Sequence, residues 1–154
     1  MQLTRATDYA LRTLMYLGAA PKGRATIAEI AAGFAISQAH LMKVVHQLGQ
    51  LGYLSTLRGR GGGIQLARPP DEILVGTVVR DVEKNLAVLE CLERADACPI
   101  TRCCVLRGAL RAATAAFLNT LDEYSLADLL RPRVKLTTAL GLTPRTGDRP
   151  DTIG

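Results

Sequence analysis

A glycine-rich segment at residues 58–63 constrains the fold of this chain more than any other feature. It reads Arg-Gly-Arg-Gly-Gly-Gly and lies between two short runs with strand character, Leu54–Leu57 and Ile64–Ala67. Glycine adopts positive φ without steric cost, so this segment predicts a tight turn that joins the two runs as a β-hairpin. A phosphate-binding loop is the competing interpretation. It needs a helix directly after the glycines, and residues 64–70 (Ile-Gln-Leu-Ala-Arg-Pro-Pro) are not typical of one.

Three helices are predicted ahead of this hairpin. Apolar residues at helical spacing predict the first over residues 4–19. Thr26 and Glu29 have the capping-box spacing and begin the second helix, and after a short break Ser37 is an expected N-cap for the third. Two helices joined by a tight turn and followed by a hairpin indicate a winged helix-turn-helix domain. We expect a mainly α fold with a small β wing, in which this domain spans residues 1–70.

Basic charge is concentrated in the predicted domain. The 154-residue chain has a net charge of +5. Residues 1–70 contain eight Lys or Arg and two acidic side chains, whereas residues 71–154 contain eleven Lys or Arg and twelve acidic side chains. A basic module joined to a neutral one indicates a polyanion as partner. We predict double-stranded DNA, with the third helix in the major groove and the hairpin arginines in the minor groove. The candidate DNA-binding residues are Ser37, Gln38, His40, Lys43, Arg58 and Arg60.

A long amphipathic helix is predicted in the second half of the chain. Its near-heptad apolar stripe consists of Leu106, Leu110, Ala113, Phe117, Leu121 and Tyr124. A domain of this size cannot cover the apolar stripe of such a helix, and we therefore expect a homodimer in which the helix pairs with its copy. The symmetry of the dimer would match a two-fold DNA operator. We therefore divide the remaining chain into a connecting helix and cluster-binding loop (71–104), a dimerisation helix (105–130) and a flexible C-terminal tail (131–154).

Four cysteines lie within fourteen residues, at positions 91, 98, 103 and 104. The chain shows no signal-peptide layout and no apolar run of the roughly 18–20 residues that span a bilayer, so we expect a cytoplasmic protein without a membrane partner. In that compartment a cysteine cluster is more often a metal or redox site than a disulfide framework. The close CxxC pairs that favour zinc are absent.

Three well-separated thiolates, Cys91, Cys98 and either Cys103 or Cys104, suit an iron–sulfur cluster. A zinc-stabilised DNA-binding protein remains the alternative. We do not expect an enzyme, because the sequence contains no Ser/His/Asp set and both histidines belong to the predicted DNA-facing helix.

Four segments together resemble the NsrR/IscR family of winged-helix regulators. They are the opening Met1–Arg12, the helix start Ile36–Lys43, the hairpin Arg58–Ile64 and the cysteine loop, and the resemblance covers roughly residues 1–130. The resemblance implies a homodimer that carries one iron–sulfur cluster per subunit. It further implies that Cys91, Cys98 and Cys104 are ligands and that Asp8, from the first helix of the partner subunit, is an oxygen ligand.

The chain from Cys98 to Leu129 is most similar to the nitric-oxide-sensing members of that family. This implies a 4Fe–4S cluster, repression of target genes, and release of DNA when nitric oxide nitrosylates the cluster. Two departures bear on the ligand set. Arg107 replaces the His that IscR-like members have three residues after the last cysteine, which argues against the alternative 2Fe–2S site, and Cys103 is an extra thiol beside Cys104. A regulator of iron–sulfur assembly or iron supply, which would sense cluster occupancy, remains the alternative function.

Overall fold

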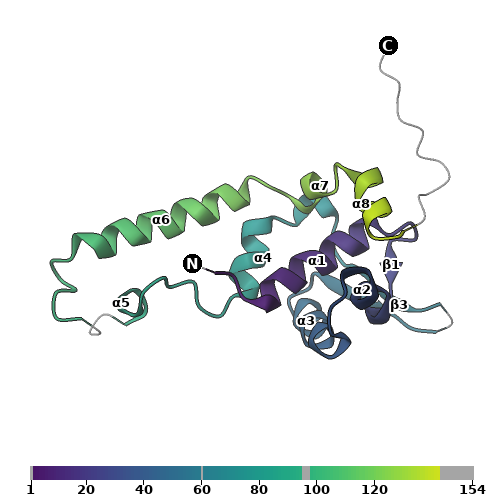
Figure 1. The fold of residues 1–154 in the computed structure, drawn as a ribbon, viewed down its shortest axis with the longest axis horizontal. Helices are drawn as coiled ribbons and strands as arrows, with labels where there is room; N and C mark the ends of the chain where they lie inside the picture. The colour runs from purple at the N-terminus through teal and green to yellow at the C-terminus, as the bar shows by residue number, and fades with distance from the viewer. Residues whose placement is uncertain (1, 60, 95–97, 143–154) are drawn as a thin grey trace, which may run out of the picture.

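Three helices and a β-hairpin form in the predicted order in the computed structural model, which describes residues 2–59, 61–94 and 98–142 (Figure 1). The expected helix-turn-helix and wing are therefore present. Their bounds are α1 Arg5–Ala19, α2 Ile27–Phe34, α3 Gln38–Gln50, β2 Leu54–Leu57 and β3 Gly63–Leu66.

The turn between α2 and α3 is shaped by local hydrogen bonds. The predicted capping box is present at the start of α2, where the backbone N–H of Thr26 donates to Glu29 Oε2 at 2.7 Å and the N–H of Glu29 donates to Thr26 Oγ1 at 3.2 Å. Ala35 ends α2 in the left-handed region, with φ of 52°. Ser37 occupies the N-cap position of α3, but its hydroxyl makes no capping hydrogen bond and so stays available to another partner.

The wing belongs to a three-stranded antiparallel sheet with strand order β1-β3-β2. The two-residue strand β1 (Arg24–Ala25) pairs with β3, and this strand was not predicted because two residues carry no periodic signal. Gly59 and Gly61 have φ of 96° and 74°, so the turn at the wing tip uses the positive φ that the glycines were expected to supply.

The hydrophobic core extends beyond residue 70, where the predicted domain ended. A 3₁₀ turn at Pro70–Glu72 leads into α4 (Val75–Val82), and α7 (Leu126–Leu129), which begins with a capping box at Ser125, returns to the same core. Core residues from these later segments pack with α1 and α3. They are Ile73, Val78, Val82, Leu126 and Leu130.

The expectation of a flexible tail from residue 131 was wrong for its first part. Residues Arg133–Ala139 form α8, Thr137 is 3% exposed, and Leu136 and Leu140 pack against the core. Leu136 and the C-cap residue Leu140, one helical turn apart, give α8 an apolar face. The rest of the predicted tail, residues 143–154, lies outside the described residues.

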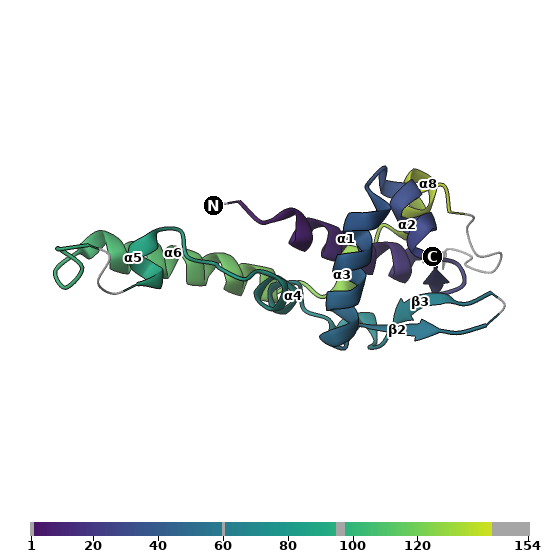
Figure 2. The ribbon, with the colours of Figure 1, turned by 90° about the horizontal axis from the view of Figure 1, so that it is seen from below.

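The predicted long helix is α6 (Val105–Asp122), and none of its residues is buried. It ends at Asp122 and not at residue 130 as predicted, because Leu126 and Leu130 turn back into the core through α7. It extends from the helical body and carries the cysteine loop and the short α5 (Glu90–Glu93) at its far end (Figure 1). Figure 2 shows this loop and the wing at opposite ends of the molecule. No helix in the described part of the chain is both long and apolar enough to cross a membrane.

Candidate DNA interface and metal centre

The exposed surface of α3 carries most of the predicted DNA-binding side chains. Ser37, Gln38, His40 and Lys43 are all exposed, whereas the opposite face of α3 is buried in the core through Leu41, Val44, Val45 and Leu48. The structure therefore brings these four candidates onto one surface, and their hydroxyl, amide, imidazole and ammonium groups can donate to phosphates and base edges.

Arginines of the basic half have different roles in the structure. Arg58 is exposed at the wing turn, and Arg60 lies outside the described residues. Arg68, in contrast, is occupied: its guanidinium donates to the carbonyls of Gly52 and Leu51 at 3.1 and 3.0 Å and stacks 4.8 Å from the ring centroid of Tyr53. Arg68 thus fixes the end of α3 to the base of the wing.

All four cysteines are free thiols near the junction of α5 and α6. Cys91, Cys98 and Cys104 are half-buried, whereas Cys103 is exposed. The thiol of Cys103 donates to the carbonyl of Ile100 at 3.5 Å, within the turn that precedes α6, and Cys104 is the N-cap residue of α6. The two adjacent thiols therefore have different surroundings.

Arg107 joins the two ends of the cysteine loop. Its Nε donates to the carbonyl of Cys91 at 3.0 Å, which ties α5 to the first turn of α6 and so to Cys104. From the sequence, Arg107 was noticed only because it replaces a histidine. Its role was missed because a contact to a backbone carbonyl leaves no signal in the spacing of residues.

Replacement of Arg107 by alanine should weaken binding of the predicted iron–sulfur cluster by roughly 10- to 100-fold, the usual cost of removing a group that orients a metal ligand. The measurement is the rate at which an iron chelator bleaches the anaerobically purified protein. Arg111→Ala is the matched control, because Arg111 is exposed one turn further along α6. Equal bleaching rates for the two variants would show that the contact to Cys91 does not organise the loop.

Asp8 lies on α1 and not in the cysteine loop. Its Oδ1 accepts from Arg12 Nε at 2.8 Å, and its side chain is 46% exposed. Within the described part of the chain, no three Cys, His, Asp or Glu side chains are grouped closely enough to hold one metal ion. That Asp8 of the partner subunit completes the ligand set therefore stays a prediction.

The last turn of α4 contacts the DNA-facing elements. Tyr53 Oη donates to Asp81 Oδ2 at 2.6 Å, and burial together with this bond raises the pKa of Tyr53. Gln47, on α3, donates from Nε2 to the carbonyl of Val82 at 3.4 Å. The position of α3 thus depends on α4.

The same turn also contacts α6 and α1. Arg80 donates to both carboxylate oxygens of Asp122 at 2.8 and 2.5 Å, and this pairing holds the pKa of Asp122 below its usual value. Glu83 Oε1 accepts from the backbone N–H of Thr4 at 2.6 Å. The segment that carries the cysteines leaves the body directly after these contacts.

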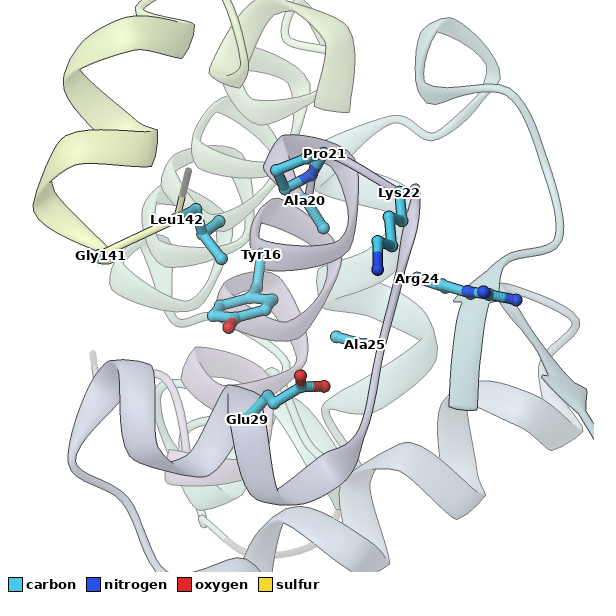
Figure 3. Close-up of a pocket in the computed structure, with 9 residues that line it drawn as sticks. All are labelled: Tyr16, Ala20, Pro21, Lys22, Arg24, Ala25, Glu29, Gly141 and Leu142. Atoms are coloured by element: carbon cyan, nitrogen blue, oxygen red, sulfur yellow. The ribbon is translucent and has the colours of Figure 1, made fainter. Parts of the chain in front are cut away.

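A cavity of about 370 Å³ lies between the end of α1, β1, α2 and the end of α8 (Figure 3). Tyr16, Lys22 and Glu29 surround it, and Arg24 extends away toward the wing. Hydrogen bonds from the backbone and hydroxyl of Thr26 hold the pKa of Glu29 below its usual value. None of the predicted site residues lines this cavity.

A helix-turn-helix whose second helix has an exposed polar face, followed by a glycine-turned wing, defines a winged-helix DNA-binding protein. The family model for Rrf2, an iron-dependent transcriptional regulator, matches residues 3–132. The chain belongs to the Rrf2 family, and it is a transcriptional regulator and not an enzyme.

Curated relatives and solved structures agree with this membership. The chain is 51% identical to the HTH-type transcriptional regulator NsrR of Geobacillus kaustophilus over 142 residues, which cover 91% of this chain and 97% of that protein. It is 45% identical to NsrR of Bacillus subtilis over 133 residues, which cover 85% and 91%. The structure of CymR, the global cysteine regulator of B. subtilis, superposes with a TM-score of 0.67 at 26% identity and covers 84% of this chain and 95% of that one. The resemblance to the NsrR/IscR family is thereby confirmed.

Proposed function

We propose that this chain is a homodimeric repressor that binds a two-fold DNA operator, holds one 4Fe–4S cluster per subunit and releases DNA in response to nitric oxide. The observation that carries the proposal is the loop with Cys91, Cys98 and Cys104, which the long α6 holds away from the winged-helix body. The similarity to NsrR regulators supports nitric oxide as the signal.

The exposure of α6 supports the homodimer. Val105 and Leu106 are 86% and 59% exposed, and Phe117 and Leu121 are only half-buried. Apolar side chains along an 18-residue helix need a cover in water, and α6 of a second subunit supplies one of matching length and pattern. This pairing gives the two-fold symmetry that an operator with two half-sites requires.

The donor set fits an iron–sulfur cluster. Three of its members, Cys91, Cys98 and Cys104, are free and half-buried thiols, the ligand type that iron–sulfur clusters use, and Asp8 is held in an exposed pair with Arg12. An exposed ion pair contributes at most about 1 kcal/mol, so Asp8 can exchange Arg12 for a metal at small cost. When bound, the cluster would supply the iron atoms with which nitric oxide reacts, held by Cys91, Cys98, Cys104 and Asp8 of the partner subunit.

The contacts around α4 supply a route from the cysteine loop to DNA. Glu83 holds the start of α1 through Thr4, while α1 packs on α3 and carries Asp8 one turn further along. If Asp8 leaves its position at the partner's loop, α1 of one subunit is no longer fixed to the other subunit. The spacing between the two α3 helices then changes, and DNA half-sites at a fixed spacing are bound less tightly.

The test is fluorescence anisotropy with an operator selected from a random duplex pool by the cluster-loaded protein. Nitric oxide should weaken binding about 100-fold, within the range of typical coupling free energies. Asp8→Ala should still bind duplex DNA but should change cluster stability or the nitric oxide response. Wild-type behaviour on both counts would remove Asp8 from the ligand set. An affinity that follows cluster occupancy but ignores nitric oxide would instead assign the chain to the control of cluster supply.

A further inference from the structure

A second cavity lies where the first turns of α1 meet the first turns of α3. Its volume is about 300 Å³, and Figure 2 shows α3 crossing α1 in this region. Two of its lining residues, His40 and Lys43, are already candidates for DNA binding, whereas the α1 residues are not. The lining residues are Arg5, Ala6, Tyr9, His40, Lys43 and Val44.

The charge around this cavity is positive and not neutralised. Its lining includes a guanidinium, an ammonium and an imidazole, and no carboxylate. Two acidic residues lie near Arg5: Asp8 follows it by three residues, and Glu83 contacts Thr4. Both have other partners, because Asp8 pairs with Arg12 and Glu83 accepts from the N–H of Thr4. Within the part of the chain that the structure describes, neither Arg5 nor Lys43 forms an ion pair. Cations that converge without a protein partner favour an anionic ligand.

The shape of the cavity suits a compact anion. Val44 is 5% exposed and forms an apolar floor, and Ala6 is small enough to leave room above it. Because the 15-residue α1 begins at Arg5, the positive end of its dipole lies at this cavity. The hydroxyl of Tyr9 has no hydrogen-bond partner among the described residues and can donate to such a ligand.

We propose that this cavity binds one backbone phosphate of the operator, with Arg5 and Lys43 supplying the charge and Tyr9 a further donor. This inference rests on the proposed function and adds α1 to the DNA interface. Contacts of this kind fix the register of a protein on the duplex without reading its sequence. The helix that would carry Asp8 toward the partner's cysteines would then also hold the DNA backbone.

The experiment measures operator affinity of the cluster-loaded protein as a function of salt. Arg5→Gln should lower affinity about 5- to 10-fold and reduce the slope of log K against log salt by about 0.9, the value for one lost phosphate contact. Lys43→Gln should act similarly, and the double variant should lose less than the sum, because both side chains contact one phosphate. Lys135→Gln is the matched control: it removes one exposed cation from α8, outside this cavity, and should leave the slope unchanged.

Three results distinguish a wrong phosphate contact, a wrong proposed function and a free phosphate as the ligand. Helix content and the thermal midpoint of each variant are compared with those of the wild type to show that it is folded. If the wild type binds its operator and Arg5→Gln has the wild-type salt slope, the phosphate contact is wrong while the proposed function stands. If the wild-type chain does not bind duplex DNA, the proposed function itself fails. If inorganic phosphate raises the thermal midpoint in an Arg5-dependent way while the DNA salt slope is unchanged, the ligand is a free phosphate and the DNA contact is overturned.

Discussion

Replacement of Cys104 by serine is expected to abolish iron–sulfur cluster binding, whereas Cys103→Ser is expected to retain the cluster. A serine hydroxyl stays protonated near neutral pH and is a poor ligand for iron, so the loss of one of three protein thiolates should leave almost no bound iron. Cys104 lies at the N-cap of α6, close to the bond between Arg107 and Cys91. Cys103 is exposed and turned toward the carbonyl of Ile100.

The measurement is iron and acid-labile sulfide per subunit, with the visible absorption spectrum, after anaerobic purification. The two variants form a matched pair, because each removes one sulfur atom from adjacent positions. Full iron content in Cys104→Ser and none in Cys103→Ser would show that the other thiol is the ligand. Full iron and sulfide content in both variants would show that neither Cys103 nor Cys104 is a cluster ligand.

Gly76→Ala is expected to destabilise the protein by roughly 1–3 kcal/mol, the usual cost of overpacking a close contact. A Cβ at position 76 would lie 2.8 Å from the carbonyl oxygen of Leu118 and would also clash with the carboxylate of Asp122. Since Asp122 is the partner of Arg80, the substitution separates α6 from α4. We expect the dimer to weaken together with the fold.

Denaturant unfolding of the cluster-free protein measures this effect, and sedimentation measures the dimer. Gly49→Ala is the control: it is also a helical glycine, but a Cβ there meets nothing within 4 Å, so the change should be neutral or stabilising by up to about 1 kcal/mol. Equal stability of Gly76→Ala and the wild type would show that α6 is not held by this close approach.

Periodic and capping signals predicted the elements that they encode locally. The apolar stripes of α1 and α6, the capping box at Thr26 and the glycines of the wing each act within a few residues, so they are visible in the sequence. Tertiary packing decided the rest. Ile73 and Leu126 join the core of α1 although they follow the predicted domain boundary, and β1 exists only because β3 provides its partner.

The candidate site likewise has features that the sequence predicted and contacts that only tertiary packing creates. Exposure of Gln38, His40 and Lys43 follows from helical spacing, so the polar face of α3 was predictable. The hydrogen bonds from Arg68 to the carbonyls of Gly52 and Leu51 were not predictable, because the composition counts every arginine as a charge available to DNA. Arg5 escaped notice because it joins His40 and Lys43 only when α1 crosses α3.

Native mass spectrometry of the anaerobically purified protein, before and after addition of nitric oxide, tests the central claim most directly. The proposed function predicts a dimer with one 4Fe–4S cluster per subunit, and a change of mass to nitrosylated species after nitric oxide is added. A 2Fe–2S dimer that ignores nitric oxide, or a protein that contains zinc, would contradict the claim and leave only the DNA-binding half of the account.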